Sequence, residues 1–319
     1  MPAILIIKTS SLGDVIHQLP AVTDIAAHVR DARFDWVVEE TFADIPALHP
    51  SVGTVIPVAT RRWRSALASR ATWRDMRQFA GRLRARAYDA VLDSQGLLKS
   101  AVVAALARGP VYGLDRASIR EPLAAFFYAR TFAVARARHA VLRNRDLAAQ
   151  AFGYAPPTGA PDYGLRIPRA DNPAGRYAVL LHATSRASKR WPNDYWTELG
   201  NALAANGIAS ILPWGTPAER QAAEAIARTV RGAGVTARLS LREVAGVVAH
   251  AAAVVGVDTG LVHLAAALAR PTVAIFIDSS PALTGVLPPD AGRALNLGGK
   301  GELPAPAAVV EALARLGVS

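Results

Sequence analysis

Short, continuous apolar runs alternate with longer amphipathic segments along this chain, and no other feature limits its fold as strongly. The run Ala3–Ile7 is typical of a strand that is buried on both faces of a parallel sheet. In residues 14–30, which follow, apolar side chains recur at helical spacing. Consecutive parallel strands need crossover connections, which are usually helical and right-handed. The alternation therefore predicts an α/β fold with parallel sheets.

A stretch that contains several Pro and Gly residues interrupts the alternation between residues 154 and 175, and it includes Asp171-Asn172-Pro173. The length of 319 residues also exceeds what one hydrophobic core usually contains. We therefore predict two Rossmann-like domains, residues 1–160 and 161–319, with this stretch as the linker. We allow for the last helix, residues 305–316, to pack back on the first domain.

The periodicity predicts the position of each element. In the first domain, we expect strands at 3–7, 34–39, 54–58 and 90–93, and helices at 14–30, 72–87, 97–107 and 139–152. In the second, we expect strands at 177–181, 208–212, 254–257 and 272–277, and helices at 193–205, 217–231, 241–252, 261–269 and 305–316.

The charge balance limits the classes of partner. The formal net charge is +11, with 36 Lys and Arg against 25 Asp and Glu, and residues 1–150 hold 21 of the basic and 13 of the acidic residues. Such an excess favours nucleic acid, an anionic membrane surface, or phosphorylated and carboxylated substrates. The chain has no Cys, which excludes disulfides, thiolate metal sites and a cysteine nucleophile.

No membrane span is visible in the sequence. The longest uncharged, apolar-rich stretch, residues 244–257, is too short to cross a bilayer and contains His250. The first residues lack the basic region of a secretory signal, and their apolar run is brief. We therefore expect a cytoplasmic protein that meets a membrane only at its inner surface.

Ligands of open α/β sheets bind at the carboxyl ends of strands, so the turns there are where chemistry is expected. The first such turn, residues 8–14, combines hydroxyl groups with Gly13 and ends at Asp14. Asp14 is either the cap of the following helix or an ionised carboxylate that serves as general base. The turn is not a dinucleotide fingerprint, because Gly13 is its only glycine.

The second turn, residues 182–190, crowds three hydroxyl groups and three cations between a strand and a helix. Hydroxyl donors can fix the geometry of a phosphate, and Lys189 supplies a point charge. A solvated basic loop is the alternative. We favour anion binding here.

The third turn follows the strand at 254–257 and reads Asp258-Thr259-Gly260, with His263 in the first turn of the next helix. Gly260 permits close approach of a ligand, and the helix N-terminus favours negative charge. The alternative is an ordinary capped helix N-terminus with a purely structural role. Asp-Thr-Gly is also the catalytic tripeptide of aspartic proteases, but those need two copies and this chain has one.

A basic stretch follows the strand at 54–58. Nine Arg and one acidic residue lie between positions 61 and 86. Arg61, Arg62 and Arg64 come directly after the strand, so we assign them to binding of phosphate or carboxylate groups, with Arg120 as a weaker candidate. For Arg82, Arg84 and Arg86 we favour a solvated helix face.

Taken in order, these segments resemble the ADP-heptose-dependent lipopolysaccharide heptosyltransferases (glycosyltransferase family 9), most closely the enzymes that add the first heptose. The matching segments span most of the chain: Lys8-Thr9-Ser10-Ser11-Leu12-Gly13-Asp14-Val15, Phe34-Asp35-Trp36-Val37-Val38-Glu39-Glu40, Arg61-Arg62-Trp63-Arg64, Gln95-Gly96-Leu97-Leu98-Lys99-Ser100, Arg120-Glu121-Pro122, Leu181-His182-Ala183-Thr184, Leu212-Pro213-Trp214-Gly215 and Val257-Asp258-Thr259-Gly260-Leu261.

The resemblance implies a GT-B fold, in which two Rossmann-like domains face each other across a cleft. It implies that the first domain binds the acceptor and the second binds the nucleotide sugar. The implied reaction is inverting transfer of L-glycero-D-manno-heptose from ADP-heptose to the first 3-deoxy-D-manno-octulosonic acid (Kdo) of Kdo2-lipid A. No cofactor and no obligatory metal are implied. We expect a peripheral enzyme at the inner face of the inner membrane, which binds its two substrates but no nucleic acid and is a monomer.

The resemblance also implies residue roles. Asp14 would be the general base, and Lys189 would assist at the leaving diphosphate. The donor would contact Ser10, Ser11, Gly13, Thr184, Ser185, Lys189, Glu219, Asp258, Thr259, Gly260 and His263. The acceptor would contact Arg61, Arg62, Arg64 and Arg120.

Three alternatives stay open at this point. The first is transfer of the second heptose, or another GT-B nucleotide-sugar reaction such as epimerisation. The second is a nicotinamide-dependent oxidoreductase, which the missing three-glycine fingerprint disfavours. The third is a nucleic-acid binder, for which no recognised motif is present.

Overall fold

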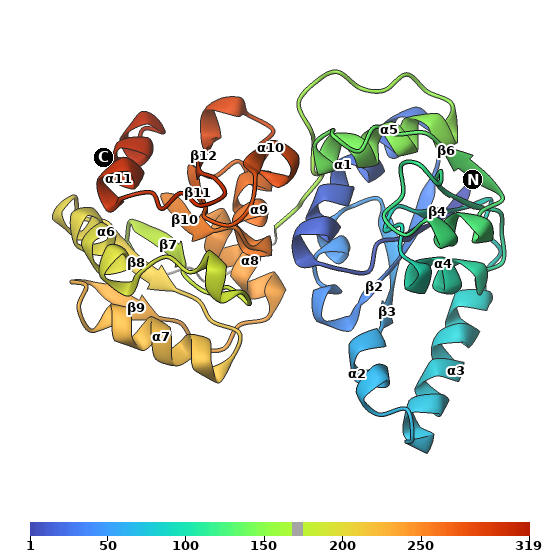
Figure 1. Ribbon diagram of the computed structural model, residues 1–319, viewed down its shortest axis with the longest axis horizontal. Helices are drawn as coiled ribbons and strands as arrows, with labels where there is room; N and C mark the ends of the chain where they lie inside the picture. The colour runs from blue at the N-terminus through green and yellow to red at the C-terminus, as the bar shows by residue number, and fades with distance from the viewer. Residues whose placement is uncertain (168–174) are drawn as a thin grey trace. The chain divides into compact units, whose positions relative to one another are not determined.

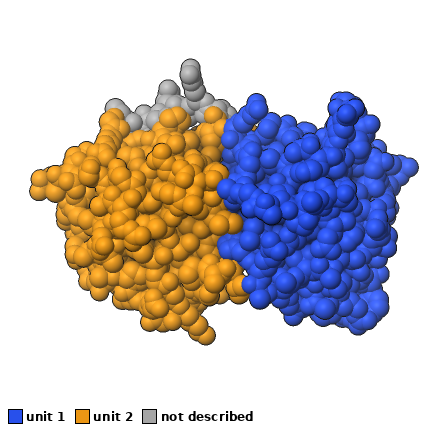
Figure 2. Space-filling model, turned by 90° about the horizontal axis from the view of Figure 1, so that it is seen from above, with its two compact units in different colours: residues 1–166 blue, residues 167–319 orange. Residues whose placement is uncertain are grey.

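The computed structural model describes residues 1–167 and 175–319, and the chain forms two compact units, Met1–Arg166 and Ile167–Ser319 (Figures 1 and 2). The observed division lies six residues beyond the predicted boundary at residue 160. Asp171-Asn172-Pro173 of the predicted linker lies outside the described residues. The prediction of two Rossmann-like α/β domains with parallel sheets is confirmed.

Unit 1 contains a six-stranded parallel sheet in the order β3-β2-β1-β4-β5-β6. Its strands are β1 (Ala3–Ile7), β2 (Arg33–Glu39), β3 (Val52–Val58), β4 (Ala90–Asp93), β5 (Val111–Leu114) and β6 (Arg130–Phe132). Its α-helices are α1 (Leu12–His28), α2 (Thr60–Ser65), α3 (Arg70–Arg84), α4 (Leu98–Ala105) and α5 (Ala140–Phe152). The short 3₁₀ helices are η1 (Glu40–Phe42), η2 (Pro46–Leu48) and η3 (Pro122–Phe127).

Unit 2 repeats this arrangement with a parallel sheet in the order β12-β11-β10-β7-β8-β9. Its strands are β7 (Tyr177–Leu181), β8 (Ala209–Leu212), β9 (Ala233–Val235), β10 (Ala253–Val257), β11 (Thr272–Phe276) and β12 (Ala294–Gly298). Its helices are α6 (Asn193–Ala205), α7 (Pro217–Ala227), α8 (Leu241–Ala249), α9 (Gly260–Ala267), α10 (Pro281–Thr284) and α11 (Pro306–Arg315), with 3₁₀ helices η4 (Ala187–Lys189) and η5 (Ala291–Arg293). Helix α11 packs against α6 and β11 of its own unit, whereas we allowed for packing on the first domain.

The central strands of both units are buried apolar runs, as their sequences predict. Ile4–Ile7 of β1 and all of β7 and β10 are buried. The strands that the sequence did not reveal are short or lie at the sheet edge. β6 exposes Arg130 and Thr131, and β9 is only three residues long, so neither has the continuous apolar run by which β1 was found.

Unit 1 extends past residue 160 because the chain that leaves α5 packs back on it. Tyr163 is buried, and the backbone N–H of Arg166 donates to the Leu48 carbonyl at 3.0 Å. Gly164 adopts φ +60°, and a Cβ on it would lie 2.3 Å from Nε2 of His49. Residues up to 166 are therefore part of the unit 1 fold rather than a free linker.

No helix within residues 1–167 or 175–319 is both long enough and apolar enough to cross a bilayer.

Candidate functional site

In each sheet the chain order reverses beside one central strand, between β1 and β4 in unit 1 and between β7 and β10 in unit 2. Side chains at the carboxyl ends of such strand pairs line the ligand site in open α/β sheets. Asp14 follows β1, Lys189 follows β7 and Asp258 follows β10. The topology thus places the central predicted residues of each unit at its reversal point.

Asp14 lies in the first turn of α1, three residues after the N-cap Ser11. Its Oδ2 accepts hydrogen bonds from the backbone N–H of Ser11 at 2.7 Å and from the Ser11 hydroxyl at 3.1 Å. Neither bond uses Oδ1, and the side chain is partly exposed. Asp14 therefore caps its helix, and the same contacts hold the carboxylate in place at the helix N-terminus.

The turn after β4 forms hydrogen bonds that hold the turn that carries Asp14 in place. Oε1 of Gln95 accepts from the backbone N–H groups of Thr9 and Ser10 at 3.0 and 3.1 Å. Nζ of Lys8 donates to the Ser94 carbonyl at 2.7 Å. Burial lowers the pKa of Lys8, whereas the negative charges of Asp14 and Asp93 oppose that shift. Lys8 and Gln95 both lie in segments on which the family resemblance rests, but the local sequence pattern did not reveal that the turns that hold them are hydrogen-bonded to each other.

Asp93 supports this pair of turns from inside the unit. Its Oδ1 accepts from the backbone of Gln95 at 2.9 Å, and its Oδ2 accepts from the hydroxyls of Ser100 at 2.9 Å and Tyr128 at 2.8 Å. The side chain is fully buried, and burial raises the pKa of Asp93 above its usual range. Hydrogen bonds to each carboxylate oxygen compensate for its loss of water.

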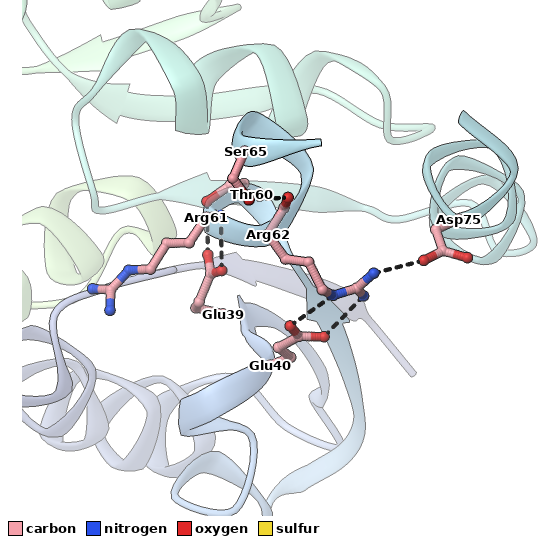
Figure 3. A network of polar contacts seen from close by, with 7 residues as sticks. All are labelled: Glu39, Glu40, Thr60, Arg61, Arg62, Ser65 and Asp75. Carbon is pink, nitrogen blue, oxygen red and sulfur yellow. Dashed lines mark hydrogen bonds and ion pairs between the residues drawn. The ribbon is translucent and has the colours of Figure 1, made fainter. Parts of the chain in front are cut away.

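The arginines after β3 form helix α2, which the sequence did not predict (Figure 3). Glu39, buried at the end of β2, accepts from the Thr60 hydroxyl at 2.7 Å and from the backbone N–H of Arg61 at 3.2 Å. These bonds anchor the first turn of α2. The Arg61 guanidinium points away from Glu39 and lies 5.6 Å from the centre of the Phe42 ring.

Arg62 is held by two carboxylates, in contrast to Arg61. Its Nε and Nη2 each donate to Glu40 at 3.1 Å, and its Nη1 donates to Asp75 at 2.8 Å (Figure 3). The hydrogen bonds to Glu40 and to Asp75 raise the pKa of Arg62, and the bonds to Glu40 contribute more. The structure thus uses this guanidinium to connect η1, α2 and α3, and it leaves Arg62 less free for a ligand than Arg61.

Arg64 and Arg120 are both exposed, and each follows the carboxyl end of a strand of the unit 1 sheet. Arg64 lies on α2, and Arg120 follows β5 and precedes η3. The backbone N of Arg120 lies within 4.0 Å of the position that a Cβ on Gly96 would occupy, and Gly96 adopts φ +68°. Arg120 is therefore adjacent to the turn after β4.

In unit 2 the turn after β7 reaches the loop after β11. The Ser188 hydroxyl donates to Oδ2 of Asp278 at 2.6 Å. Thr184 is partly exposed and Ser185 is exposed, so both hydroxyls are accessible to a ligand. Asp278 had no role in the sequence analysis, because nothing local marks it.

Asp258 is the centre of the unit 2 site. It forms an ion pair with Lys189, accepts from the Ser279 hydroxyl at 2.6 Å, and lies 3.7 Å from Nε2 of His263. Burial alone would raise the pKa of Asp258, but hydrogen bonds from His263, Lys189 and Ser279 together hold it well below its usual range. The structure thus brings together three residues that were predicted for donor binding, Lys189, Asp258 and His263. Ser279, which was not predicted, contacts Asp258 as well.

Two further predicted segments also follow the carboxyl ends of strands in the unit 2 sheet. Thr259 is the N-cap of α9, and Gly260 begins that helix, so free backbone N–H groups lie beside Asp258. Glu219 lies in the first turn of α7, where its Oε2 accepts from the backbone N–H groups of Gly215 and Thr216 at 2.8 and 3.0 Å. Nε2 of His182 contacts the Glu219 carbonyl at 3.1 Å and so joins the turn after β7 to α7.

Comparison with known proteins adds an independent observation. Residues 76–303 match the family described as glycosyltransferase family 9 (heptosyltransferase). Lipopolysaccharide heptosyltransferase 1 of Pseudomonas aeruginosa is 50% identical over 285 residues, which cover 88% of this chain and 80% of that protein. The protein of the same name from Escherichia coli K12 is 46% identical over 286 residues, covering 88% of this chain and 90% of the other. Lipopolysaccharide heptosyltransferase 2 of Escherichia coli K12 is 31% identical over only 103 residues, covering 30% of this chain and 29% of that protein.

Solved structures agree with these relatives. The Escherichia coli heptosyltransferase WaaC with ADP has a TM-score of 0.91 and 42% identity, covering 98% of this chain and 99% of that chain. WaaC with ADP-2-deoxy-2-fluoro heptose has a TM-score of 0.87, again at 42% identity, with 97% and 98% of the two chains covered.

Proposed function

The chain belongs to glycosyltransferase family 9 (heptosyltransferase), and on that premise we propose that it transfers L-glycero-D-manno-heptose from ADP-heptose to the first Kdo of Kdo2-lipid A. The product is the start of the lipopolysaccharide inner core. The relatives named heptosyltransferase 1 match over most of the chain, whereas those named heptosyltransferase 2 match over a third of it or less. This difference favours the first heptose over the second.

The observation that carries the proposal is the charged centre at the reversal point of unit 2. Lys189, held by Asp258, lies beside the N-terminus of α9. A diphosphate placed there would meet an ammonium group, the helix N-terminus and the hydroxyls of Thr184, Ser185 and Thr259. We assign Glu219, whose backbone carbonyl contacts His182 of the turn after β7, to the ribose of the same nucleotide. In this proposal, phosphate oxygens replace Asp258 as a partner of Lys189.

Asp14 would remove the proton from the acceptor. The Kdo hydroxyl oxygen attacks the anomeric carbon of the heptose, its proton passes to Asp14, and the bond from that carbon to the diphosphate oxygen breaks. ADP leaves with the bonding electrons, and Lys189 and the α9 N-terminus stabilise the charge that develops on it. The contacts from Ser11 direct Oδ2 of Asp14 into the turn, which leaves Oδ1 to accept the proton.

Ser10, Ser11 and Gly13 are in the same turn as Asp14, and in this proposal they contact the sugar part of the donor. Because Asp14 belongs to unit 1 and Lys189 to unit 2, the reaction requires groups from both units on the substrates. Transfer should therefore depend on a conformation in which both units engage them.

The acceptor carries carboxylates on Kdo and phosphates on lipid A, and we assign Arg61, Arg64 and Arg120 to them. All three are exposed, and the Arg61 guanidinium makes no ion pair within the described part of the chain. Arg62 was predicted for the same task. Its contacts with Glu40 and Asp75 support a role in holding α2, with a smaller contribution to the acceptor.

We propose that the transfer needs no cofactor and no obligatory metal, because Lys189 and the α9 N-terminus can supply the positive charge at the leaving group. Full activity in the presence of a chelator is the expected result. Since the acceptor is a lipid, we also propose that the enzyme acts as a peripheral protein on the inner face of the inner membrane.

The proposed reaction is tested by an ADP-release assay with ADP-heptose as donor. Kdo2-lipid A and the same lipid already carrying one heptose are compared as acceptors. Release with the first and little with the second is expected. Release only with the heptosylated acceptor would assign the protein to the second heptose instead.

A further inference from the structure

One surface of unit 1 reverses the usual placement of small and large apolar residues. In η3, Ala124 and Ala125 are buried, whereas Leu123 and Phe126 are 61% and 68% exposed and Phe127 is 41% exposed. Large apolar side chains are normally the ones that folding buries, so this arrangement contributes little to the stability of unit 1.

Helix α4 shows the same reversal and packs against η3. Its Ala101 and Ala104 are buried, whereas Leu98 and Val102 are 39% and 46% exposed. Half of the exposed large apolar side chains found among the described residues thus belong to these two adjacent elements. We call this surface the α4–η3 patch; its members are Leu98, Val102, Leu123, Phe126 and Phe127. An exposed apolar cluster of this kind marks an interaction site rather than ordinary surface.

Cations accompany the patch. The Arg116 guanidinium lies 4.7 Å from the centre of the Phe126 ring. Lys99, Arg120 and Arg130 are exposed on the same elements or next to them. Of the nearby acidic groups, Glu121 accepts from the backbone N–H of Leu98 at 2.7 Å and Asp115 accepts from that of Ser118 at 2.8 Å. Both carboxylates are therefore engaged with the backbone, and the surroundings of the patch are net positive.

We propose that the α4–η3 patch docks unit 1 on an anionic bilayer, with its apolar side chains in the interfacial region and its cations on the headgroups. The choice of a bilayer rests on the proposed function, since it is the lipid acceptor that places the enzyme at a membrane. The patch also adjoins a residue that is predicted to bind the acceptor, because Arg120 directly precedes Glu121 and η3. Docking there would bring Arg120, one of the predicted acceptor cations, to the headgroup level.

Vesicle co-sedimentation without substrates tests the proposal. Vesicles of phosphatidylethanolamine with phosphatidylglycerol are compared with vesicles of phosphatidylcholine. The parent protein should bind the anionic vesicles more tightly. The double variant Leu123→Ser/Phe126→Ser should bind them at least about tenfold more weakly, because two exposed apolar side chains are removed. The matched control is Leu283→Ser/Leu303→Ser, which changes two exposed leucines of unit 2 and should bind like the parent.

The result is separated from the reaction by a second assay. With a deacylated, water-soluble Kdo acceptor, the double variant should release ADP at the parent rate, which shows that it is folded. Absence of release from the parent with every acceptor would refute the proposed function and leave the vesicle result readable. The docking proposal is overturned if parent and double variant bind vesicles equally, or if neither vesicle binds the parent. It is also overturned if the parent is a dimer in sedimentation velocity and the double variant is a monomer, since a second copy would then cover the patch.

Discussion

The turn after β1 in unit 1 and the turn after β7 in unit 2 occupy equivalent places in two sheets of the same strand order, yet they hold their functional groups differently. Asp14 is held by Ser11, three residues away in the sequence. Lys189 is held by Asp258, which is 69 residues away. The common fold supplies the location, while the loop residues determine the charge that each site presents.

This difference has a consequence for what each residue does in the absence of substrate. Asp14 is positioned by its own helix and keeps one carboxylate oxygen free of the capping bonds. Lys189 forms an ion pair with the carboxylate of Asp258, which a diphosphate would replace in the proposed mechanism. In the proposed mechanism, unit 1 therefore supplies a general base that is already positioned, and unit 2 supplies a cation whose charge is balanced by an ion pair until the diphosphate binds.

The largest expected effect is that of Asp14→Asn on transfer. The amide keeps the size of the side chain but accepts a proton poorly, so kcat should fall by about a thousandfold. ADP affinity, measured by calorimetry, should change little. Ser11→Ala serves as the comparison, since it removes one capping contact and keeps the carboxylate. It should lose about 1 kcal/mol of stability and, because Ser11 is assigned to the sugar part of the donor, raise the Michaelis constant for ADP-heptose, while its loss of kcat stays far smaller than that of Asp14→Asn. A kcat of Asp14→Asn near that of the parent would make Asp14 a cap only.

The second test concerns Lys189 and its ion pair with Asp258. Lys189→Met should weaken ADP binding by about 10- to 100-fold, because a charge-assisted contact with phosphate is lost. It should also destabilise unit 2, because Asp258 would be left without its cation in a largely buried site. The double variant Lys189→Met/Asp258→Asn should regain stability but not ADP affinity. Recovery of ADP affinity along with stability would show that Lys189 has only a structural role.

A third test asks how unit 1 responds to acid. Burial lowers the pKa of His49 to about 4 from 6.5. Between these two values the unfolded chain binds a proton that the folded chain does not, so stability falls as the pH decreases through this range. From pH 7.5 to 5 the loss attributable to His49 should be about 2 kcal/mol. Urea unfolding at both pH values should show a drop smaller by that amount in His49→Gln. An equal drop in parent and variant would exclude His49 as the source.

The smallest expected effects distinguish two neighbouring arginines. Arg61→Ala should raise the Michaelis constant for Kdo2-lipid A by about tenfold, because its guanidinium is available to an anionic group. Arg62→Ala should raise it by less than about threefold, because Glu40 and Asp75 already engage its guanidinium. The Michaelis constant for ADP-heptose should be unaffected in both. A larger effect of Arg62 than of Arg61 would mean that the acceptor displaces those carboxylates.

The contrast between the two turns also explains what could be predicted from the sequence. The capping role of Asp14 could be recognised because its partners are local, whereas its role as a base stays a prediction. The buried strands β1, β7 and β10 were found because each is a continuous apolar run. Lys189 and Asp258 were each singled out from their own turns, but their ion pair depends on the pairing of β7 with β10.

What the sequence could not show was mostly set by contacts between distant segments. Gln95 fixes the Asp14 turn from 85 residues away, and Ser279 reaches Asp258 from 21 residues away. Helix α2 was missed because it is a short, Arg-rich segment whose first turn depends on the buried Glu39. The exposure of Phe126 over buried alanines has no sequence signature, since an apolar segment normally predicts core.

The proposed mechanism requires the donor diphosphate to bind at the reversal point of unit 2. A crystal structure of this protein with ADP tests it most directly. The diphosphate is expected within hydrogen-bond distance of Nζ of Lys189 and of the backbone N–H groups at the start of α9, with the contact between Lys189 and Asp258 lengthened. A diphosphate bound instead on the turn formed by residues 8–14 of unit 1 would contradict it.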